Sequence, residues 1–334
     1  MASLPLIALA VLISITSYII TKITIRILLR YNLVGIDVHK PWKPKVAEPG
    51  GIALLITCSA SILLVLLLKP LEIDYTKFIA VIISTIYAGL VGLLDDIKVL
   101  DAKTKTLLTF TTAMPIILLG AYTPRPIMPF AGTLRITIIY PLFIPFAYMI
   151  ALNAVNMSDT HNGVMPSTAL IIGGVLLFST ISTYIKGYTD LTGFVLSLIL
   201  VSMLLGYVWF NWYPAKVFNG DSGSFLVAAL IIGSAIVGRA EVPVIIAMMV
   251  YIVNGFQILA SIKGLVERRS IIRPVVVENG WIKANKDPRA PITIPHLLSL
   301  RDKVNEKEII AGYLILSIIS GILGIITAIL CYWL

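Results

Sequence analysis

The sequence predicts an all-α polytopic membrane protein with about ten transmembrane helices and a small cytoplasmic β-hairpin in its last long loop. Of its 334 residues, 58% are hydrophobic and only 13% are charged, and the mean hydropathy is +0.96. A water-soluble domain cannot bury so much apolar surface. Apolar runs of near membrane-spanning length recur along the whole chain, so residues 1–334 are expected to form a single integral membrane domain.

Ten such runs are the predicted spans. They lie at 4–29, 51–68, 77–94, 107–120, 136–154, 164–184, 191–210, 224–237, 242–262 and 309–332. The runs at 107–120 and 224–237 are short, and their ends are the least well defined. The first run does not resemble a cleaved signal, because it is too long and its basic residues follow it. With ten spans, both termini lie on the same side of the membrane.

The distribution of charge predicts which side that is. The loops after the odd-numbered spans are 30–50, 95–106, 155–163, 211–223 and 263–307, and together they carry 18 Lys and Arg against 6 in the opposite loops. The positive-inside rule therefore places these five loops in the cytoplasm and both termini outside. The net charge of +9 is explained by this orientation and requires no nucleic acid.

Acidic residues gather in the same loops, where 13 of the 17 lie within or directly beside them. Cations alone would suit an anionic lipid surface, whereas mixed carboxylates and lysines favour a metal–phosphate site. The two cysteines, Cys58 and Cys331, lie in apolar runs and indicate no disulfide framework.

The stretch VGLLDDIKVLDAKTK places two aspartates at the end of the third span. On a continuous helix, Asp95 and Asp96 point about 100° apart, while Asp95 can meet Lys98 and Asp101 can meet Lys105. One interpretation is a solvated helix end with ion pairs. The other is a carboxylate that serves a metal or a proton transfer, with a lysine that neutralises phosphate.

The stretch NAVNMSDTHNGV spaces Asn153, Asn156, Asp159 and Asn162 three residues apart. This spacing forms one polar helical stripe, or its breakdown into a loop, and buried amides need partners. Simple helix capping is the alternative. His161 alone is more typical of a capping or surface histidine than of a ligand.

The stretch VFNGDSGSFLVA sets Asp221 between Gly220 and Gly223, before the eighth span. A glycine turn that leads into a helix N-terminus suits an anion or a metal–phosphate group, because free amides point at the ligand. Taken alone, the same pattern favours an ordinary N-cap formed by the aspartate or a serine.

Two further loops carry candidate residues. GIDVHKPWKPKVAEPGG is a basic, proline-punctuated loop that contains Lys40 and Glu48. In the last long loop, short strands at 273–277 and 281–284 around Asn-Gly predict a hairpin. The segment DPRAPITIPHLL follows, with Arg289 and His296.

Taken in order, the motifs DD, NAxNxxDxxNG and FxGDxGS resemble the polyprenyl-phosphate N-acetylhexosamine-1-phosphate transferase family. The basic loop looks most like the archaeal and eukaryotic branch that uses dolichyl phosphate. The resemblance implies catalytic roles for Asp95, Asp96 and Asp159. It implies a Mg²⁺ site, with Mn²⁺ as a substitute, formed by Asp221 and Asn156. It implies substrate binding by Lys40, Glu48, Lys105, Asn162, Phe218, Arg289 and His296.

Within this set, the resemblance assigns Lys105 to the pyrophosphate, Asn162 to uracil and Phe218 to a stack on the base. The chain departs from the family at Thr160, where glycine is usual, and in the arginines expected near Ile294–Pro295. Arg289 is a loose substitute for those arginines, so the resemblance leaves recognition of the sugar open.

The implied reaction transfers N-acetylglucosamine 1-phosphate from a UDP-sugar to polyprenyl or dolichyl phosphate in the bilayer and releases UMP. This is the first step of lipid-linked glycan assembly. The alternatives are a transferase for another UDP-hexosamine and a secondary transporter, which would gather its polar residues near the midplane. No nucleic acid is expected as a partner, and a homodimer is left open.

Overall fold

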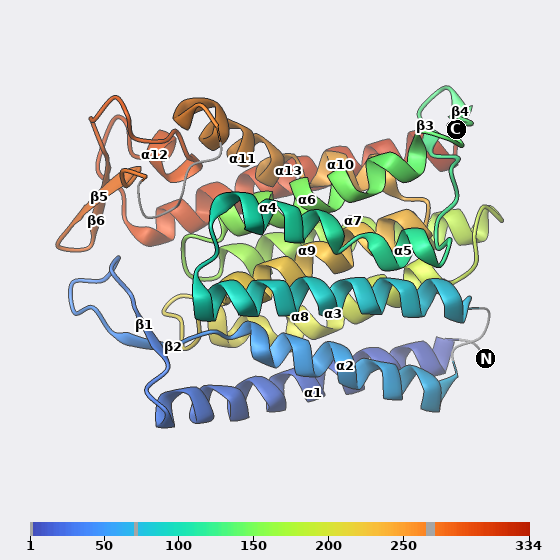
Figure 1. Ribbon diagram of the computed structural model, residues 1–334, viewed down its shortest axis with the longest axis horizontal. Coiled ribbons are helices and arrows are strands. Elements are labelled where there is room, and N and C mark those ends of the chain that lie inside the picture. Colours follow the sequence, from blue (N-terminus) through green and yellow to red (C-terminus); the bar gives the residue numbers. More distant parts are fainter. Residues whose placement is uncertain (1–2, 70–72, 265–270) are drawn as a thin grey trace.

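The computed structural model describes residues 3–69, 73–264 and 271–334; residues 265–270 of the predicted loop 263–307 therefore lie outside the described residues. Long helices run side by side along the longest axis of the molecule (Figure 1). Among the described residues, eight helices are long and apolar enough to cross a bilayer. The protein is thus an integral membrane protein.

These eight helices are α1 (Ser3–Arg30), α2 (Gly51–Leu68), α3 (Tyr75–Lys98), α6 (Tyr140–Ser158), α7 (Val164–Ile185), α8 (Thr192–Asn211), α9 (Gly220–Val237) and α13 (Glu306–Tyr332). A ninth span is formed if α10 (Glu241–Ala247) and α11 (Met249–Ile262) are counted together, although they are bent by 63° at Met248. This pair covers the predicted run at 242–262.

The predicted span at 107–120 is not one continuous helix. It is divided between α4 (Ala102–Thr111) and α5 (Met114–Leu118), which follow one another along the bundle (Figure 1). Pro115 lies in the first turn of α5, where its missing N–H is tolerated but could not continue a helix from α4. The expected number of about ten spans is therefore eight, or nine with the bent pair, by length and composition.

Helix α9 lies inside the bundle, and 94% of its apolar window is buried. Its first turn is pressed against two neighbouring backbones. A Cβ added to Gly92 of α3 would lie 2.3 Å from the Asp221 carbonyl oxygen, and one added to Gly51 of α2 would lie 2.2 Å from the Gly223 nitrogen. Glycine is required at both positions because the helices touch there.

Short hairpins and one short helix complete the fold. Strands β1 (Val34–Ile36) and β2 (Lys45–Ala47) pair, as do β3 (Ile127–Met128) and β4 (Gly132–Thr133), and β5 (Val275–Glu278) and β6 (Trp281–Ala284); α12 spans Ile294–Leu298. The hairpin predicted in the last long loop is confirmed. Asn279 and Gly280 have φ of 49° and 81°, as a type I′ turn requires.

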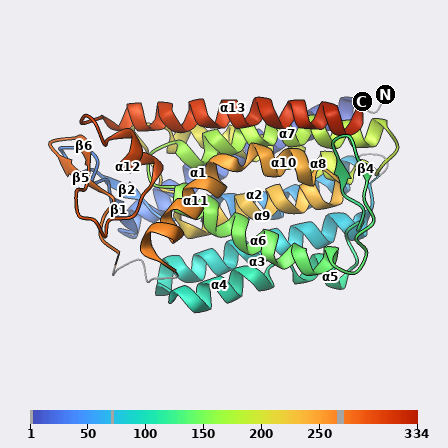
Figure 2. The ribbon, with the colours of Figure 1, turned by 90° about the horizontal axis from the view of Figure 1, so that it is seen from above.

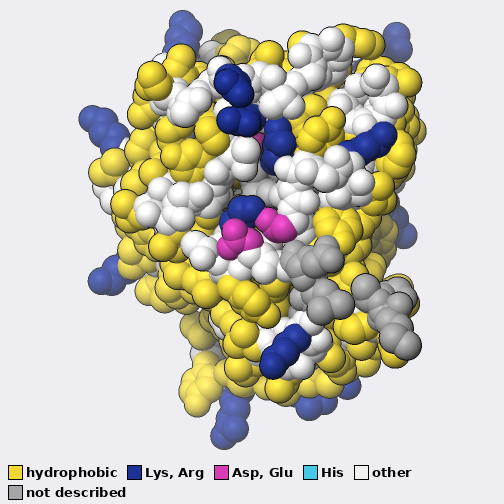
Figure 3. Space-filling view, turned by 90° about the vertical axis from the view of Figure 1, so that its right-hand side faces the viewer, with side chains coloured by type: hydrophobic (Ala, Val, Ile, Leu, Met, Phe, Trp, Pro, Cys, Tyr) yellow, Lys and Arg dark blue, Asp and Glu magenta, His cyan; other side chains and the backbone are white. Residues whose placement is uncertain are grey.

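The two ends of the bundle differ. The β1–β2 and β5–β6 hairpins and α12 gather at one end, here called the hairpin end, and both termini lie at the other (Figures 1 and 2). The terminal end shows mostly hydrophobic and basic side chains and few acidic ones (Figure 3). The described parts of all five loops that the sequence assigns to one side lie at the hairpin end (Figure 1).

Candidate active site

A cavity of about 780 Å³ opens at the hairpin end, between the β1–β2 loop, α6, the first turn of α9 and β5. Its volume lies in the range of small-molecule sites, roughly 300–1,000 Å³. The predicted site residues that line it are Glu48, Asp96, Asn156, Asp159, Asn162, Phe218 and Asp221. The structure thus brings three motifs that are far apart in the sequence to one cavity.

Asp221 is the centre of a polar cluster that reaches from the cavity to α4. Its carboxylate accepts hydrogen bonds from Asn156 Nδ2, at 2.7 Å, and from Lys105 Nζ. Lys105 Nζ also contacts Asp95 Oδ2 at 2.8 Å. Asp95, Lys105, Asn156 and Asp221, hereafter the Asp221 cluster, therefore join α3, α4, α6 and α9 at one point.

The charge of Lys105 is secured by this arrangement. Burial lowers the pKa of Lys105, whereas the carboxylates of Asp221 and Asp95 raise it by a larger amount. The pKa therefore lies above its ordinary value of 10.5. The ammonium group is therefore present at any physiological pH. A fixed cation beside a cavity is suited to an anionic ligand.

Asp96 bonds to different groups from Asp95. Its Oδ1 accepts from the Asp221 backbone N–H at 2.7 Å, and its Oδ2 accepts from the Ser222 N–H at 3.0 Å and the Ser222 hydroxyl at 2.7 Å. Asp96 thus caps α9 from another helix. The residue at the N-cap position of α9, Asn219, makes no capping bond of its own.

The alternative that Asp221 is only an N-cap does not agree with this geometry. Asp221 lies within the first turn of α9, and its carboxylate bonds to Lys105 and Asn156 of other helices. Asp101 does act as a cap. It accepts from the amides of Lys103 and Thr104, both at 3.0 Å, at the start of α4.

Phe218 is a half-buried ring on the cavity wall. Its backbone is held on both sides, because its N–H donates to the Ala47 carbonyl at 2.9 Å and its carbonyl accepts from the Gly50 N–H at 2.7 Å. A Cβ on Gly35 would lie 3.0 Å from the ring and 2.2 Å from Glu48 Oε2. Glycine at position 35 therefore leaves room for Phe218 and Glu48.

Asp159 also lines the cavity, and its carboxylate accepts from the Asn219 side chain. Asn219 Nδ2 lies 2.9 Å from each carboxylate oxygen of Asp159. The side-chain oxygen of Asn219, Oδ1, is buried and has no hydrogen-bond partner among the described residues. Asn219 was not singled out in the sequence, although it is part of the FNGDSGS motif.

A second polar network lies deeper in the cavity wall and was not anticipated from the sequence. Lys40 Nζ contacts Asp37 and, at 3.0 Å, Glu306 Oε2. Asn162 Nδ2 donates to Asp37 Oδ2 at 3.0 Å and to Glu306 Oε1. Asp37, Lys40, Asn162 and Glu306 are hereafter the Asn162 network. Lys40 is only 2% exposed, so its ammonium is directed at these carboxylates.

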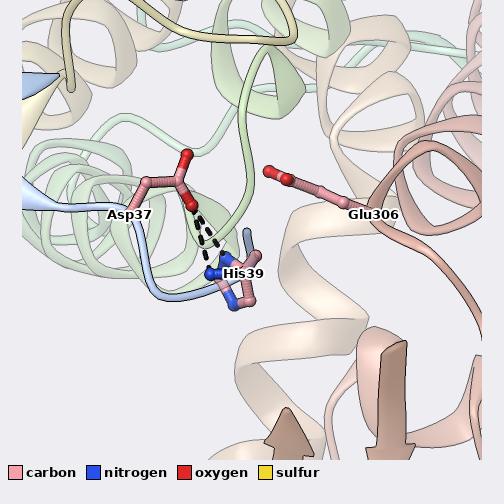
Figure 4. A group of neighbouring side chains, drawn as sticks. All are labelled: Asp37, His39 and Glu306. Atoms are coloured by element: carbon pink, nitrogen blue, oxygen red, sulfur yellow. Dashed lines mark hydrogen bonds and ion pairs between the residues drawn. The ribbon is translucent and has the colours of Figure 1, made fainter. Parts of the chain in front are cut away.

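The chemistry of the two clusters differs with respect to a metal ion. Asp37, His39 and Glu306 offer ligand atoms within 4.8 Å of one another, and Figure 4 shows the Glu306 carboxylate directed toward Asp37. However, the Lys40 ammonium already joins the two carboxylates. The Asp221 cluster offers only oxygen ligands besides Lys105, which is the set that Mg²⁺ prefers.

His161 is stacked on His39, with ring centroids 4.3 Å apart, and it lines the cavity. Burial, together with the nearby His39 and Lys40, holds the pKa of His161 well below 6.5. Burial likewise lowers the pKa of His39, although Glu306 and Asp37 oppose this effect. Both rings are therefore predominantly neutral at pH 7.

Four predicted substrate-binding residues do not line the cavity: Lys40, Lys105, Arg289 and His296. Lys40 and Lys105 belong to the two polar clusters described above, and the other two lie in the last long loop. Arg289 is 78% exposed and pairs with Asp287 at 2.9 Å. His296 Nδ1 lies 2.8 Å from the Pro274 carbonyl oxygen, and only its neighbours Thr293 and Pro295 line the cavity.

Comparisons with known proteins agree with this picture. Residues 78–239 match the pattern of "Glycosyl transferase family 4". A proposed UDP-N-acetylglucosamine–dolichyl-phosphate N-acetylglucosaminephosphotransferase of Saccharolobus solfataricus is 31% identical over 71% of this chain and 73% of its own. One of the same name from Sulfolobus acidocaldarius is 25% identical over 93% of each chain.

A proposed glycosyltransferase of Methanocaldococcus jannaschii is 28% identical over 95% of this chain and 94% of its own. These similarities extend beyond the matched pattern to nearly the whole bundle. The chain therefore belongs to glycosyl transferase family 4, the membrane phosphotransferases that join a sugar 1-phosphate to polyprenyl phosphate.

Proposed function

We propose that the protein transfers N-acetylglucosamine 1-phosphate from UDP-N-acetylglucosamine to polyprenyl or dolichyl phosphate and releases UMP. The observation that carries the proposal is the Asp221 cluster, which places carboxylates, an amide and a fixed cation where the cavity meets the bundle. The names of the relatives from Saccharolobus solfataricus and Sulfolobus acidocaldarius support the donor and the acceptor.

Asp221 and Asn156 are the residues that would hold Mg²⁺. A half-turn of the Asn156 amide would direct its oxygen instead of its nitrogen at Asp221. Both residues line the cavity, and Mg²⁺ usually takes one or two protein oxygens and completes its shell with phosphate and water. When bound, the ion supplies positive charge that stabilises the pyrophosphate and the departing UMP.

The remaining roles belong to groups of the chain itself. Lys105 supplies a second positive charge for the pyrophosphate. Asp95, which is fixed by Lys105 and by the Leu100 N–H at 2.6 Å, orients the acceptor phosphate or takes its residual proton. Because the second pKa of a phosphate monoester is near 6, a general base is not obligatory. Phe218 offers a ring for the uracil to stack on.

The position of the site favours a transferase over the transporter that the sequence left open. A transporter would bind its cargo near the bilayer midplane, whereas the cavity opens at the hairpin end of the bundle. We place this end in the cytoplasm because its loops hold the larger share of Lys and Arg. A water-soluble donor and a membrane-anchored acceptor can meet there.

The test is an assay of the purified protein in detergent, with polyprenyl phosphate and radiolabelled UDP-sugars. We expect label to enter the butanol phase with UDP-N-acetylglucosamine and UMP to appear in equal amount. A preference for UDP-N-acetylgalactosamine or for UDP-N-acetylmuramoyl-pentapeptide would show that the donor proposed here is wrong and that the type of reaction is right. No transfer with any of these donors, with Mg²⁺ or Mn²⁺, would contradict the proposal.

A further inference from the structure

We propose that Asp37 and Glu306 are positioning residues that hold the Asn162 amide in one orientation, so that it accepts but cannot donate a hydrogen bond to the base. The inference rests on the proposed function, since it concerns the uridine of the donor. It adds two residues that neither the motifs nor the family resemblance assigned.

The hydrogen bonds of the Asn162 side chain can be counted. An amide has two N–H groups and two carbonyl lone pairs. Both N–H groups of Nδ2 are used, one by Asp37 Oδ2 at 3.0 Å and one by Glu306 Oε1. The oxygen Oδ1 accepts from the Ala215 N–H at 2.6 Å. One lone pair of Oδ1 therefore remains for a ligand, and no N–H remains.

The opposite orientation of the amide is strongly disfavoured. It would direct Oδ1 at two carboxylates, which only accept hydrogen bonds, and Nδ2 at the Ala215 N–H, which only donates. The residues of the Asn162 network are at most 3% exposed, so water cannot relieve these repulsions. The Lys40 ammonium bonds to both carboxylates and neutralises part of their negative charge beside Asn162.

The network also fixes where Asn162 lies. The Asn162 backbone N–H donates to Glu306 Oε1 at 3.1 Å, so α13 holds the loop that follows α6 as well as the side chain. Asp37 comes from the β1–β2 loop, whose β2 strand supports the backbone of Phe218. The acceptor on Asn162 and the ring of Phe218 therefore border one cavity at positions set by shared elements.

An amide that can only accept distinguishes two pyrimidines. N3 of uracil carries a hydrogen and donates, whereas N3 of cytosine is an acceptor. At N3, uracil can donate to the remaining lone pair of Asn162 Oδ1, whereas cytosine would bring two acceptors together in a buried site. Leaving buried polar groups unpaired is the strongest way in which a binding site rejects a close analogue.

The experiment compares UMP and CMP as competitive inhibitors of the full-length protein in detergent. We expect the wild type to bind UMP at least about 100-fold more tightly than CMP. Glu306→Gln and Asp37→Asn each replace a pure acceptor by an amide that can face Asn162 in either orientation. Each should reduce the UMP preference by about tenfold, and the double variant by more, with KM for the donor changing more than kcat.

Glu308→Gln is the matched control, because Glu308 lies on the same turn of α13 but its carboxylate accepts from the N–H of the cap residue Asn305. It should retain the wild-type UMP preference. Inhibition constants are compared only among variants whose thermal unfolding shows that they are folded. If the double variant does not fold, either single variant is sufficient to test the proposal.

Two failures can be told apart. If the wild type binds CMP as tightly as UMP, the uridine donor of the proposed function is wrong. If the wild type prefers UMP and the folded variants keep that preference, the proposed function stands and the positioning role of Asp37 and Glu306 is wrong. A wild type that binds N3-methyl-UMP as well as UMP would also overturn the role assigned to Asn162.

Discussion

At the scale of single residues, the adjacent aspartates of α3 serve different neighbours. Asp95 pairs with Lys105 in the Asp221 cluster, whereas Asp96 caps α9 through the amides of Asp221 and Ser222. The divergence follows from the helix, since successive residues point about 100° apart. Asp96 therefore caps α9 from α3, while the Asp221 carboxylate bonds to Lys105 and Asn156.

This division gives a sharp expectation for Asp221→Asn. The substitution retains volume but removes the charge needed to hold Mg²⁺, so we expect activity to fall by several orders of magnitude. Thermal stability should remain near that of the wild type, because Asp96 continues to cap α9. Initial rates across Mg²⁺ and Mn²⁺ titrations provide the measurement, and Mn²⁺ should restore part of the rate. A near-normal rate with the wild-type Mg²⁺ dependence would show that Asp221 holds no metal.

A second prediction at this scale concerns pH and His161. Burial lowers its pKa in the folded protein below the ordinary 6.5. Between these two pKa values the unfolded chain binds the additional proton, so stability is lost as pH falls below about 6.5. Thermal unfolding between pH 7.5 and 5 should show this decline. The slope should be smaller in His161→Gln than in the wild type; equal slopes in the two proteins would contradict the assignment.

At the scale of elements, the site depends on how closely three helices meet. Gly51 of α2 and Gly92 of α3 contact the backbone of the first turn of α9, which carries Asp221. Close contact at this turn brings Asp96 to the α9 amides and Lys105 to Asp221. Bulk added at either glycine would separate the groups that the site requires to be adjacent.

We therefore predict that Gly92→Ala is damaging. Its Cβ would lie 2.3 Å from a backbone oxygen that cannot move without shifting α9, and overpacking of this kind costs about 1–3 kcal/mol. Activity should fall together with thermal stability. Gly174→Ala in α7 is the control, because nothing lies within 4 Å of its added Cβ. Similar behaviour of the two variants would refute the close helix contact.

At the scale of the whole molecule, the bundle has a chemical end and a terminal end. The cavity, two hairpins and α12 lie at the first, and both termini lie at the second (Figure 1). The broken pair α4–α5, which replaces the span predicted at 107–120, runs along the bundle between these two ends (Figure 1). Assignment of the chemical end to the cytoplasm remains a prediction from loop charge.

Cysteine labelling tests that orientation. In a variant that lacks Cys58 and Cys331, single cysteines at the exposed positions Lys103 and Lys286 should be shielded from impermeant thiol reagents added to intact cells. A cysteine at the exposed Arg135, in the loop that follows β4, should be labelled. Labelling of positions 103 and 286 from outside, with protection of 135, would reverse the topology.

The membrane helices, the last hairpin and the family of this protein can be predicted from the sequence alone. Long apolar runs predict membrane helices because the bilayer core imposes their length. The Asn-Gly turn of the last hairpin is predictable because only a few residues adopt positive φ at both central positions. The motifs around Asp95, Asn156 and Asp221 indicate the family in their order along the chain. Each of these signals lies within a short stretch of sequence or depends only on the order of the motifs along the chain.

The tertiary structure decided what no local pattern specifies. Asp96 meets amides 125 residues away, and Asn162 meets Glu306 across 144 residues. Pairings of this kind depend on which helices lie side by side and how closely they approach. Hydrophobic periodicity reports only that a face is buried. The assignment of Asp96 as a cap and the acceptor-only orientation of Asn162 therefore emerged only when the helices were packed together.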